Sequence, residues 1–324
     1  MIEILSTPPL NTVQDLGRFG LRHYGVSTSG VMDMVACKVA NHLLGNPDNA
    51  AVIEVQMFPF QLKFLSPMAF AISGADTRIT LDGTRLPVCW TATALQGQVL
   101  TLEAPKNGCR AYIALGGGVD VPLLLNSRST HLRSGFGGYQ GRSLQAGDRL
   151  AICASKQSGH KAFGVVPPAL ALPALAPDRE DVDLVFRVIK AGDYGIFPPA
   201  MQDRFWHVGW KISHQSDRGG YRLSGPPLEL PAPVELRSYG LVAGIIQVPP
   251  SGVPIIQLSD ANTAGGYPKM ATVIDADLWR LGQARPGSMI AFKDVSHEEA
   301  VAAMVPINAY LANVERLAAL YRMA

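Results

Sequence analysis

The sequence predicts a mainly β fold with a few helices, arranged as two tandem β-barrel domains. The chain contains 32 Gly and 24 Pro, about 17% of its 324 residues, whereas average proteins contain roughly 12%. Such a composition favours short strands joined by tight turns. Short apolar runs bounded by turn residues are the second observation; they are 60–64, 69–73, 99–102, 111–115, 184–189 and 234–238. Only two stretches have a helical period, so helices are a minority.

A change in composition divides the chain into two halves. Residues 165–177 read VVPPALALPALAP, a segment that should form neither a helix nor a ladder of strands. We therefore predict a first domain over 1–160, an Ala/Pro-rich linker over 161–180, and a second domain over 181–324 that ends in a helix. Each half contains Gly-Gly-Tyr, at 137–139 and 265–267, followed later by a tight turn into an apolar strand. This shared order indicates duplication of one β-rich unit.

Both predicted helices have recognisable ends. Residues 32–44 place Val35, Val39 and Leu43 on one stripe and end at Gly45. Residues 296–323 begin with the capping box Ser-x-x-Glu at Ser296 and should be broken or kinked by Pro306.

Composition also excludes several classes of protein. Hydrophobic residues make up 48% of the chain and charged residues 17%, which is too apolar for disorder. The formal net charge is +2, so no electrostatic argument supports binding to nucleic acid or to an anionic membrane. The first residues, MIEIL, lack the features of a secretory signal. Four scattered cysteines without a Cys-x-x-Cys pair indicate reduced thiols and a cytoplasmic protein.

Four clusters combine glycines with charged or hydroxylated residues, a mixture suited to backbone amides that approach a polar ligand. They lie at 14–20, 115–142, 216–223 and 247–268. Arg128, Arg142 and Arg218 offer planar guanidinium groups that suit carboxylate or phosphate. The alternative is structural, because Gly-rich turns at strand ends often serve only to allow positive φ, with the arginines in solvent.

Other motifs fail. Gly116-Gly117-Gly118 lacks the spacing of a phosphate-binding P-loop, no Gly-x-Ser-x-Gly is present, and seven histidines without metal spacing predict no metal site. Pro268-Lys269-Met270 is only superficially similar to the biotin-acceptor Met-Lys-Met, so we expect no covalent biotin and an exposed Lys269.

At the four clusters the chain resembles the carboxyltransferase-domain family once called allophanate hydrolase subunit 2, which includes KipA-type proteins and the C subunits of 5-oxoprolinases. The resemblance covers most of the chain outside the linker and the last helix: 13–25, 30–47, 116–122, 126–150, 216–226, 244–252 and 260–273. It implies cyclophilin-like β-barrels. The chain departs from the family's usual pattern: Asn126 replaces Gly, Gly219 replaces Met, and Ala261, Asn262 and Ala264 replace Arg, Gln and Thr.

The resemblance implies a subunit of an ATP-dependent 5-oxoprolinase, which opens 5-oxo-L-proline to L-glutamate together with a B-type (KipI-like) and an A-type subunit, with ATP and Mg²⁺ in the assembled complex. The alternatives are a carboxyltransferase subunit of a biotin-dependent urea or amide carboxylase, and a non-catalytic KipA-type regulator of a kinase. The expected catalytic residues are Arg128, Arg142, Arg218 and Asp260. The expected substrate-binding residues are Ser127, Thr130, Gly137, Gly138, Tyr221, Thr263, Gly265, Gly266 and Tyr267.

Overall fold

A computed structural model describes residues 1–154, 161–232, 234 and 236–323, which form two compact units. The first unit comprises Met1–Arg18, Ser29–Pro173 and Pro306–Ala324, and the second comprises Phe19–Thr28 and Ala174–Val305. Neither unit is a continuous stretch of sequence.

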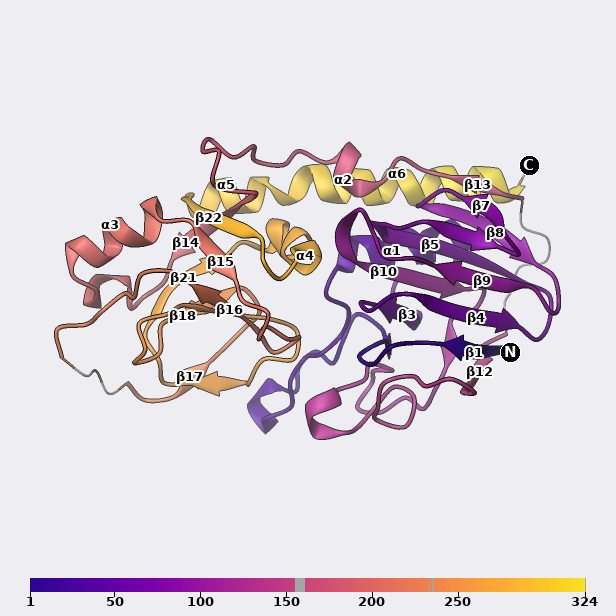
Figure 1. Cartoon of the computed structure of the whole chain (residues 1–324), viewed down its shortest axis with the longest axis horizontal. Coiled ribbons are helices and arrows are strands. Elements are labelled where there is room, and N and C mark those ends of the chain that lie inside the picture. The colour runs from indigo at the N-terminus through magenta and orange to yellow at the C-terminus, as the bar shows by residue number, and fades with distance from the viewer. Residues whose placement is uncertain (155–160, 233, 235, 324) are drawn as a thin grey trace. The chain divides into compact units, whose positions relative to one another are not determined.

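The strands of the first unit form a seven-stranded sheet, in the order β11-β12-β1-β4-β9-β6-β7, and a six-stranded sheet, in the order β13-β8-β5-β10-β3-β2 (Figure 1). Their bounds are β1 Ile2–Ser6, β2 Thr12–Gln14, β3 Val52–Val55, β4 Phe60–Phe64, β5 Met68–Asp76, β6 Ile79–Leu81, β7 Thr84–Leu86, β8 Trp90–Ala94, β9 Val99–Leu102, β10 Asn107–Leu115, β11 Val119–Asp120, β12 Arg149–Ile152 and β13 Phe163–Gly164. The helices are α1 Met34–Leu44, α2 Pro168–Ala171 and most of α6 Met304–Met323, with a 3₁₀ turn at Leu132–Ser134.

Alternation of side chains along the strands builds the core of this unit. In β4, Phe60, Leu62 and Phe64 are fully buried while Gln61 and Lys63 are half-buried, as expected for a strand with one face on a core. Helix α1 packs on β5 and β10. Its predicted stripe of Val35, Val39 and Leu43 is buried.

Seven strands of the second unit close into a barrel, in the order β14-β21-β18-β19-β16-β15-β22 (Figure 1). Closure comes from the parallel pairing of β14 with β22, in the register Leu184 to Ile290, and the other pairs are antiparallel. The strands are β14 Leu184–Lys190, β15 Trp210–Ile212, β16 Gly220–Ser224, β18 Ile245–Gln247, β19 Ile255–Gln257, β21 Lys269–Val273 and β22 Met289–Asp294, with a separate pair β17 Tyr239–Gly240 and β20 Ala264–Gly265. The helices are α3 Pro199–His207, α4 Asp275–Gln283 and α5 His297–Ala302, with 3₁₀ turns at Arg22–Tyr24 and Tyr194–Ile196.

A buried ion pair fixes α4 to the barrel. Asp277, which is fully buried, accepts hydrogen bonds from the backbone N–H of Arg187 at 2.8 Å and from its Nη2 at 2.6 Å. An unpaired carboxylate at this position would be costly, so the buried Asp277 depends on this partner.

The structure confirms the mainly β fold with few helices and a β-barrel, which lies in the second unit. The capping box of α5 is present at Ser296 and Glu299, and the helical segment is divided between α5 and α6, shortly before Pro306. Residues 163–164 form β13 and residues 168–171 form the single-turn helix α2, so the expectation that the Ala/Pro-rich segment forms no regular structure was wrong. Pro168 stands at the first turn of α2, where its missing N–H costs nothing.

Two further expectations differ from the structure. Helix α6, which we placed in the second domain, groups from Pro306 onward with the first unit. A strand was predicted over 234–238. Residue 235 lies outside the described residues, and the other residues of this range form no strand. Strand β17 begins at Tyr239 instead. Among the described residues, no helix has both the length and the apolarity to span a membrane.

Candidate functional site

The Ser-Arg-Ser-Thr loop (residues 127–130) of the first unit is organised around Asp15. The Asp15 carboxylate accepts hydrogen bonds from Gly17 N at 2.8 Å, Ser127 Oγ at 2.7 Å and Arg128 N at 2.6 Å, and also from Ser129 Oγ. Asp15 is 1% exposed, and four donors compensate its buried charge. The hydroxyl of Ser127, a predicted substrate-binding group, is therefore directed at Asp15.

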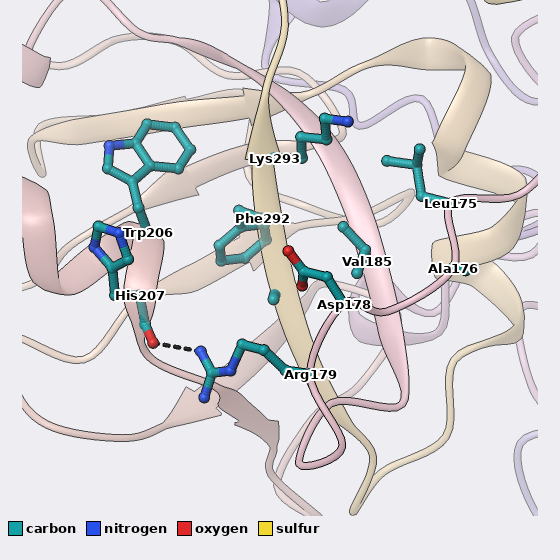
Figure 2. Close-up of a pocket in the computed structure, with 10 residues that line it drawn as sticks. Leu175, Ala176, Asp178, Arg179, Val185, Trp206, His207, Phe292 and Lys293 are labelled. Atoms are coloured by element: carbon teal, nitrogen blue, oxygen red, sulfur yellow. Dashed lines mark hydrogen bonds between the residues drawn. The ribbon is translucent and has the colours of Figure 1, made fainter.

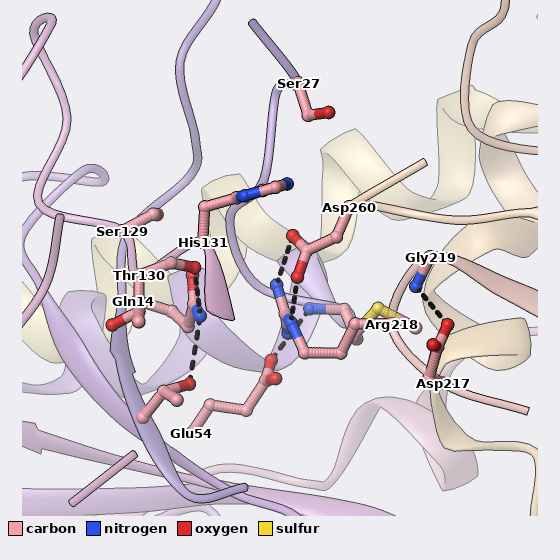
Figure 3. A network of polar contacts seen from close by, with 12 residues as sticks. Gln14, Ser27, Glu54, Ser129, Thr130, His131, Asp217, Arg218, Gly219 and Asp260 are labelled. Carbon is pink, nitrogen blue, oxygen red and sulfur yellow. Dashed lines mark hydrogen bonds and ion pairs between the residues drawn. The ribbon is translucent and has the colours of Figure 1, made fainter. Parts of the chain in front are cut away.

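Thr130 and Gln14 continue this network (Figure 3). Thr130 Oγ1 donates to Val13 O at 2.8 Å, and Gln14 Nε2 donates to Thr130 O at 3.1 Å. Gln14 Oε1 is buried and has no hydrogen-bond partner in the described part of the chain. A buried acceptor without a partner is rare in a folded protein and marks a place where a water molecule or a ligand could donate.

The loop at Gly137 and Gly138 packs tightly against the Ser-Arg-Ser-Thr loop. Both residues have positive φ, 71° and 53°, and a Cβ atom would collide with Ser129 O at Gly137 and with Thr130 Oγ1 at Gly138. Glycine is therefore required here for close approach. Within the described residues, the N–H groups of Gly137 and Gly138 donate no hydrogen bond.

Arg128 and Arg142 differ in how fully their guanidinium groups are used. Arg142 forms a bidentate pair with Asp148, with both N–O distances 2.7 Å. Arg128 Nε donates to Val121 O at 3.0 Å, and its Nη2 lies 3.6 Å from Asp120 Oδ1. The Arg128 side chain is 30% exposed. Of the two, Arg128 keeps more donor capacity for a bound anion.

In the second unit, Arg218 and Asp260 form a buried pair (Figure 3). Arg218 Nε donates to Asp260 Oδ2 at 2.9 Å and Nη2 to Oδ1 at 3.2 Å, and the two residues are 5% and 8% exposed. The nearby Asp217 caps a turn by accepting from Gly219 N at 2.7 Å. Tyr221, predicted to bind substrate, is 1% exposed and donates its hydroxyl to Ala284 O at 3.0 Å, so it supports the interior of the barrel.

The Gly-Gly-Tyr loop (residues 265–267) of the second unit is held by Lys269. Lys269 is 3% exposed, which corrects our expectation of a surface lysine. Its Nζ donates to Gly265 O at 3.2 Å and to Tyr267 O at 3.4 Å, and lies 3.1 Å from the centre of the Tyr239 ring. Burial lowers the pKa of Lys269. The aromatic face and the two carbonyls offset only part of the cost of burying this cation.

Two further groups connect this loop to the barrel. Gln247 Nε2 donates to Tyr267 O at 3.3 Å, and Gln257 Nε2 donates to Gln247 Oε1 at 3.0 Å. Asp193 accepts from the Tyr239 hydroxyl and from Lys269 N at 3.0 Å. These polar residues are scattered in the sequence, and only the pairing of strands brings them together.

Thr263, Gly265, Gly266 and Tyr267 lie along one edge of this cluster. Thr263 is half-buried and its carbonyl accepts from Leu241 N at 2.9 Å, Gly265 pairs with Tyr239 in the β17–β20 ladder, and Tyr267 is 47% exposed. A Cβ at Gly266 would lie 2.7 Å from Leu236 O. Close approach of two segments explains the absence of a side chain at Gly266.

The structure also bears on two departures from the family pattern. Asn126 has φ of 60°, and after glycine, asparagine is among the residues that best tolerate this left-handed region. Ala261 is 3% exposed, and its carbonyl accepts from Ser27 Oγ at 2.7 Å. In the described residues, no group of three or more His, Cys, Asp or Glu side chains could hold a metal ion. All four cysteines are free thiols, two of them buried.

Comparisons with known proteins identify the family. The model of the carboxyltransferase domain, subdomain A and B, matches residues 24–294, and the chain belongs to this family. It is 40% identical over 317 residues to the C subunit of 5-oxoprolinase from Haemophilus influenzae, covering 98% of both chains, and 40% identical over 303 residues to that of Escherichia coli, covering 94% of both. The structure of K. lactis urea amidolyase aligns with a TM-score of 0.85 and 29% identity, over 97% of this chain and 20% of that one. The family predicted from the sequence clusters is thereby confirmed.

Proposed function

We propose that this chain is the C subunit of an ATP-dependent 5-oxoprolinase, which hydrolyses 5-oxo-L-proline to L-glutamate. The observation that carries the proposal is 40% identity to two proteins named as the C subunit of 5-oxoprolinase along nearly their whole length. Urea amidolyase supports the alternative, a carboxyltransferase subunit, less strongly. The identity is lower, and this chain spans only 20% of that protein.

The chemical difficulty in this reaction is the lactam carbonyl, which is a poor electrophile. Conversion of its oxygen to a phosphate ester would provide a leaving group, so that water can attack the carbon. That route needs positive groups for the phosphate and for the carboxylate of the substrate. Arg128 is the best candidate here, because its Nη atoms are the least committed of the three arginines. Gly137 and Gly138 would add two N–H donors.

Arg142, Arg218 and Asp260 would act less directly. Each belongs to a bidentate pair within its own unit, and breaking such a pair to bind substrate would leave a charge without its partner. In the proposal they position the loops that carry them. Lys269 likewise positions the Gly-Gly-Tyr loop of the second unit.

ATP, Mg²⁺ and the partner subunits complete the proposal. The donor set of the described residues does not fit Mg²⁺, because no cluster of three suitable side chains is present among them, so no step is assigned to a metal on this chain. We place ATP and Mg²⁺ in the assembled complex with a B-type and an A-type subunit, in the cytoplasm. The chain itself would carry no covalent biotin.

The test is reconstitution of the complex from the purified chain and its B-type and A-type partners with ATP and 5-oxo-L-proline. We expect L-glutamate and ADP to appear together. Arg128→Ala should lower kcat by about 10²-fold or more, the size seen when one donor to a transition-state anion is lost. Arg149→Ala, at a side chain that is 64% exposed, should have wild-type activity and serves as the matched control.

Other outcomes would decide against the proposal. Carboxylation of urea with a biotinylated carrier protein, and no glutamate formation, would establish the carboxyltransferase alternative. Inactivity in both assays would favour the remaining alternative, a non-catalytic regulatory protein. Full activity of a folded Arg128→Ala variant would show that Arg128 does not bind the substrate or the phosphate.

A further inference from the structure

A cavity of about 430 Å³ lies in the second unit, apart from the loops described above. The end of α3 and strands β14 and β22 line it, together with Leu175, Ala176, Asp178 and Arg179 (Figure 2). Its volume is in the range of cavities that hold small molecules, about 300–1,000 Å³.

One part of the cavity lining is apolar. Val185, Ala291 and Phe292 are buried, with exposures of 7%, 7% and 5%. Leu175 packs against the cluster that contains Val185 and Ala291. On the opposite wall is Trp206, whose indole N–H donates to Tyr194 Oη at 2.9 Å and is thereby held in place (Figure 2). Such a lining favours an apolar or aromatic group.

The charged residues of the lining fall into two kinds. Arg179 is committed to its surroundings, because it pairs with Asp181 at 2.9 Å through Nε and donates to His207 O. Asp178 and Lys293 also line the cavity, and within the described part of the chain neither side chain forms an ion pair or a hydrogen bond with any group, including each other. Both side chains are exposed to solvent, so one anion and one cation without a protein partner border the same apolar surface.

We propose that this cavity binds a zwitterionic α-amino acid with an apolar side chain. Asp178 would receive the α-ammonium group, Lys293 would bind the α-carboxylate, and the side chain would lie on Val185 and Ala291, which are paired in register on neighbouring strands. The two charged contacts are of the charge-assisted kind. L-glutamate would fit less well, because its second carboxylate would face the apolar lining at a desolvation cost. The site goes beyond the proposed function and uses none of its residues.

Isothermal titration calorimetry of the full chain with L-phenylalanine tests the proposal without any activity assay. Lys293→Met and Asp178→Asn should each weaken binding at least about tenfold, the loss expected for one charge-assisted hydrogen bond. Lys211→Met and Glu180→Gln change exposed residues of the same unit that do not line the cavity, and both should bind like the wild type.

Probe chemistry provides a second readout on the wild-type protein. 3-Phenylpropionate lacks the ammonium group, so it should bind more weakly than L-phenylalanine and lose nothing further in Asp178→Asn, while Lys293→Met still weakens it. L-glutamate should bind at least about tenfold more weakly than L-phenylalanine. The absence of binding at millimolar L-phenylalanine, or equal affinities for wild type and both cavity variants, would overturn the assignment.

Discussion

Carboxylates in the glycine-rich clusters act mainly as acceptors for their own loops. Asp15 collects four donors, Asp217 caps a turn, and Asp260 is paired with Arg218. The sequence identifies these residues because aspartate and glycine mark turns. It does not show which donor reaches each carboxylate, since the partners of Asp15 in the Ser-Arg-Ser-Thr loop are more than a hundred residues away.

Asp148 provides a prediction at the level of a single residue. Burial alone would raise its pKa, but hydrogen bonds from Arg142 and from Gln145 N outweigh burial and lower the pKa below its ordinary value of 3.8. A carboxyl group with a lowered pKa in the folded state stabilises the protein above the unfolded pKa, and this contribution is lost as the pH falls through the folded value.

The free energy of unfolding should therefore depend less steeply on pH below about 4 in Asp148→Asn than in the wild type. Urea unfolding measured across that range checks this. Arg142→Ala should flatten the curve in the same way, whereas Arg85→Ala, at an exposed arginine, should leave it as in the wild type. Parallel curves for wild type and Asp148→Asn would show that the pair contributes nothing to acid sensitivity.

Both ends of helix α1 are marked by residues that typically begin and end helices. Asp33 caps the first turn by accepting from Ala36 N at 2.8 Å, and Gly45 ends the helix with φ of 69°. Gly45→Ala should cost about 1 kcal/mol of the free energy of unfolding, because a Cβ is unfavourable at positive φ. Gly192→Ala is the control, since that glycine has no positive φ and no atom within 4 Å of a built Cβ. Chemical denaturation of both variants measures the difference, and equal stabilities would contradict the argument.

Strands were predictable where apolar residues form a run, and were missed or shortened where polar residues take part. The runs 60–64 and 99–102 coincide with β4 and β9. Strand β10 begins at Asn107, four residues before the predicted run: Asn107 pairs with Asp76 of β5, and an irregularity in the register separates this pair from Ala111. Lys269 was misjudged because its burial depends on the ring of Tyr239, which is distant in the sequence, as well as on the neighbouring Gly-Gly-Tyr loop.

At the scale of the whole molecule, order along the chain does not determine which unit a segment joins. Helix α6 follows the second unit in sequence and still groups with the first, where Arg322 Nη1 donates to His42 O at 2.7 Å and Tyr310 Oη donates to Val166 O at 2.7 Å. Tyr321 also stacks on Phe163, with ring centres 5.0 Å apart. Amphipathic spacing shows that a helix has a buried side, but it does not identify the surface that covers it.

The grouping of α6 with the first unit predicts which part of the protein loses stability when α6 is altered. Val314 is 1% exposed, and Val314→Ala should reduce stability by about 2 kcal/mol by leaving a cavity. In hydrogen exchange followed by mass spectrometry, peptides from α1 and β13, which contact α6, should lose protection. Those from the barrel strands β14 to β22 should keep theirs, because local stability follows local packing. Val301→Ala, at a side chain that is 59% exposed, should change neither set. Loss of protection confined to the barrel would contradict this grouping and would show that α6 belongs to the second unit, as its place in the sequence suggested.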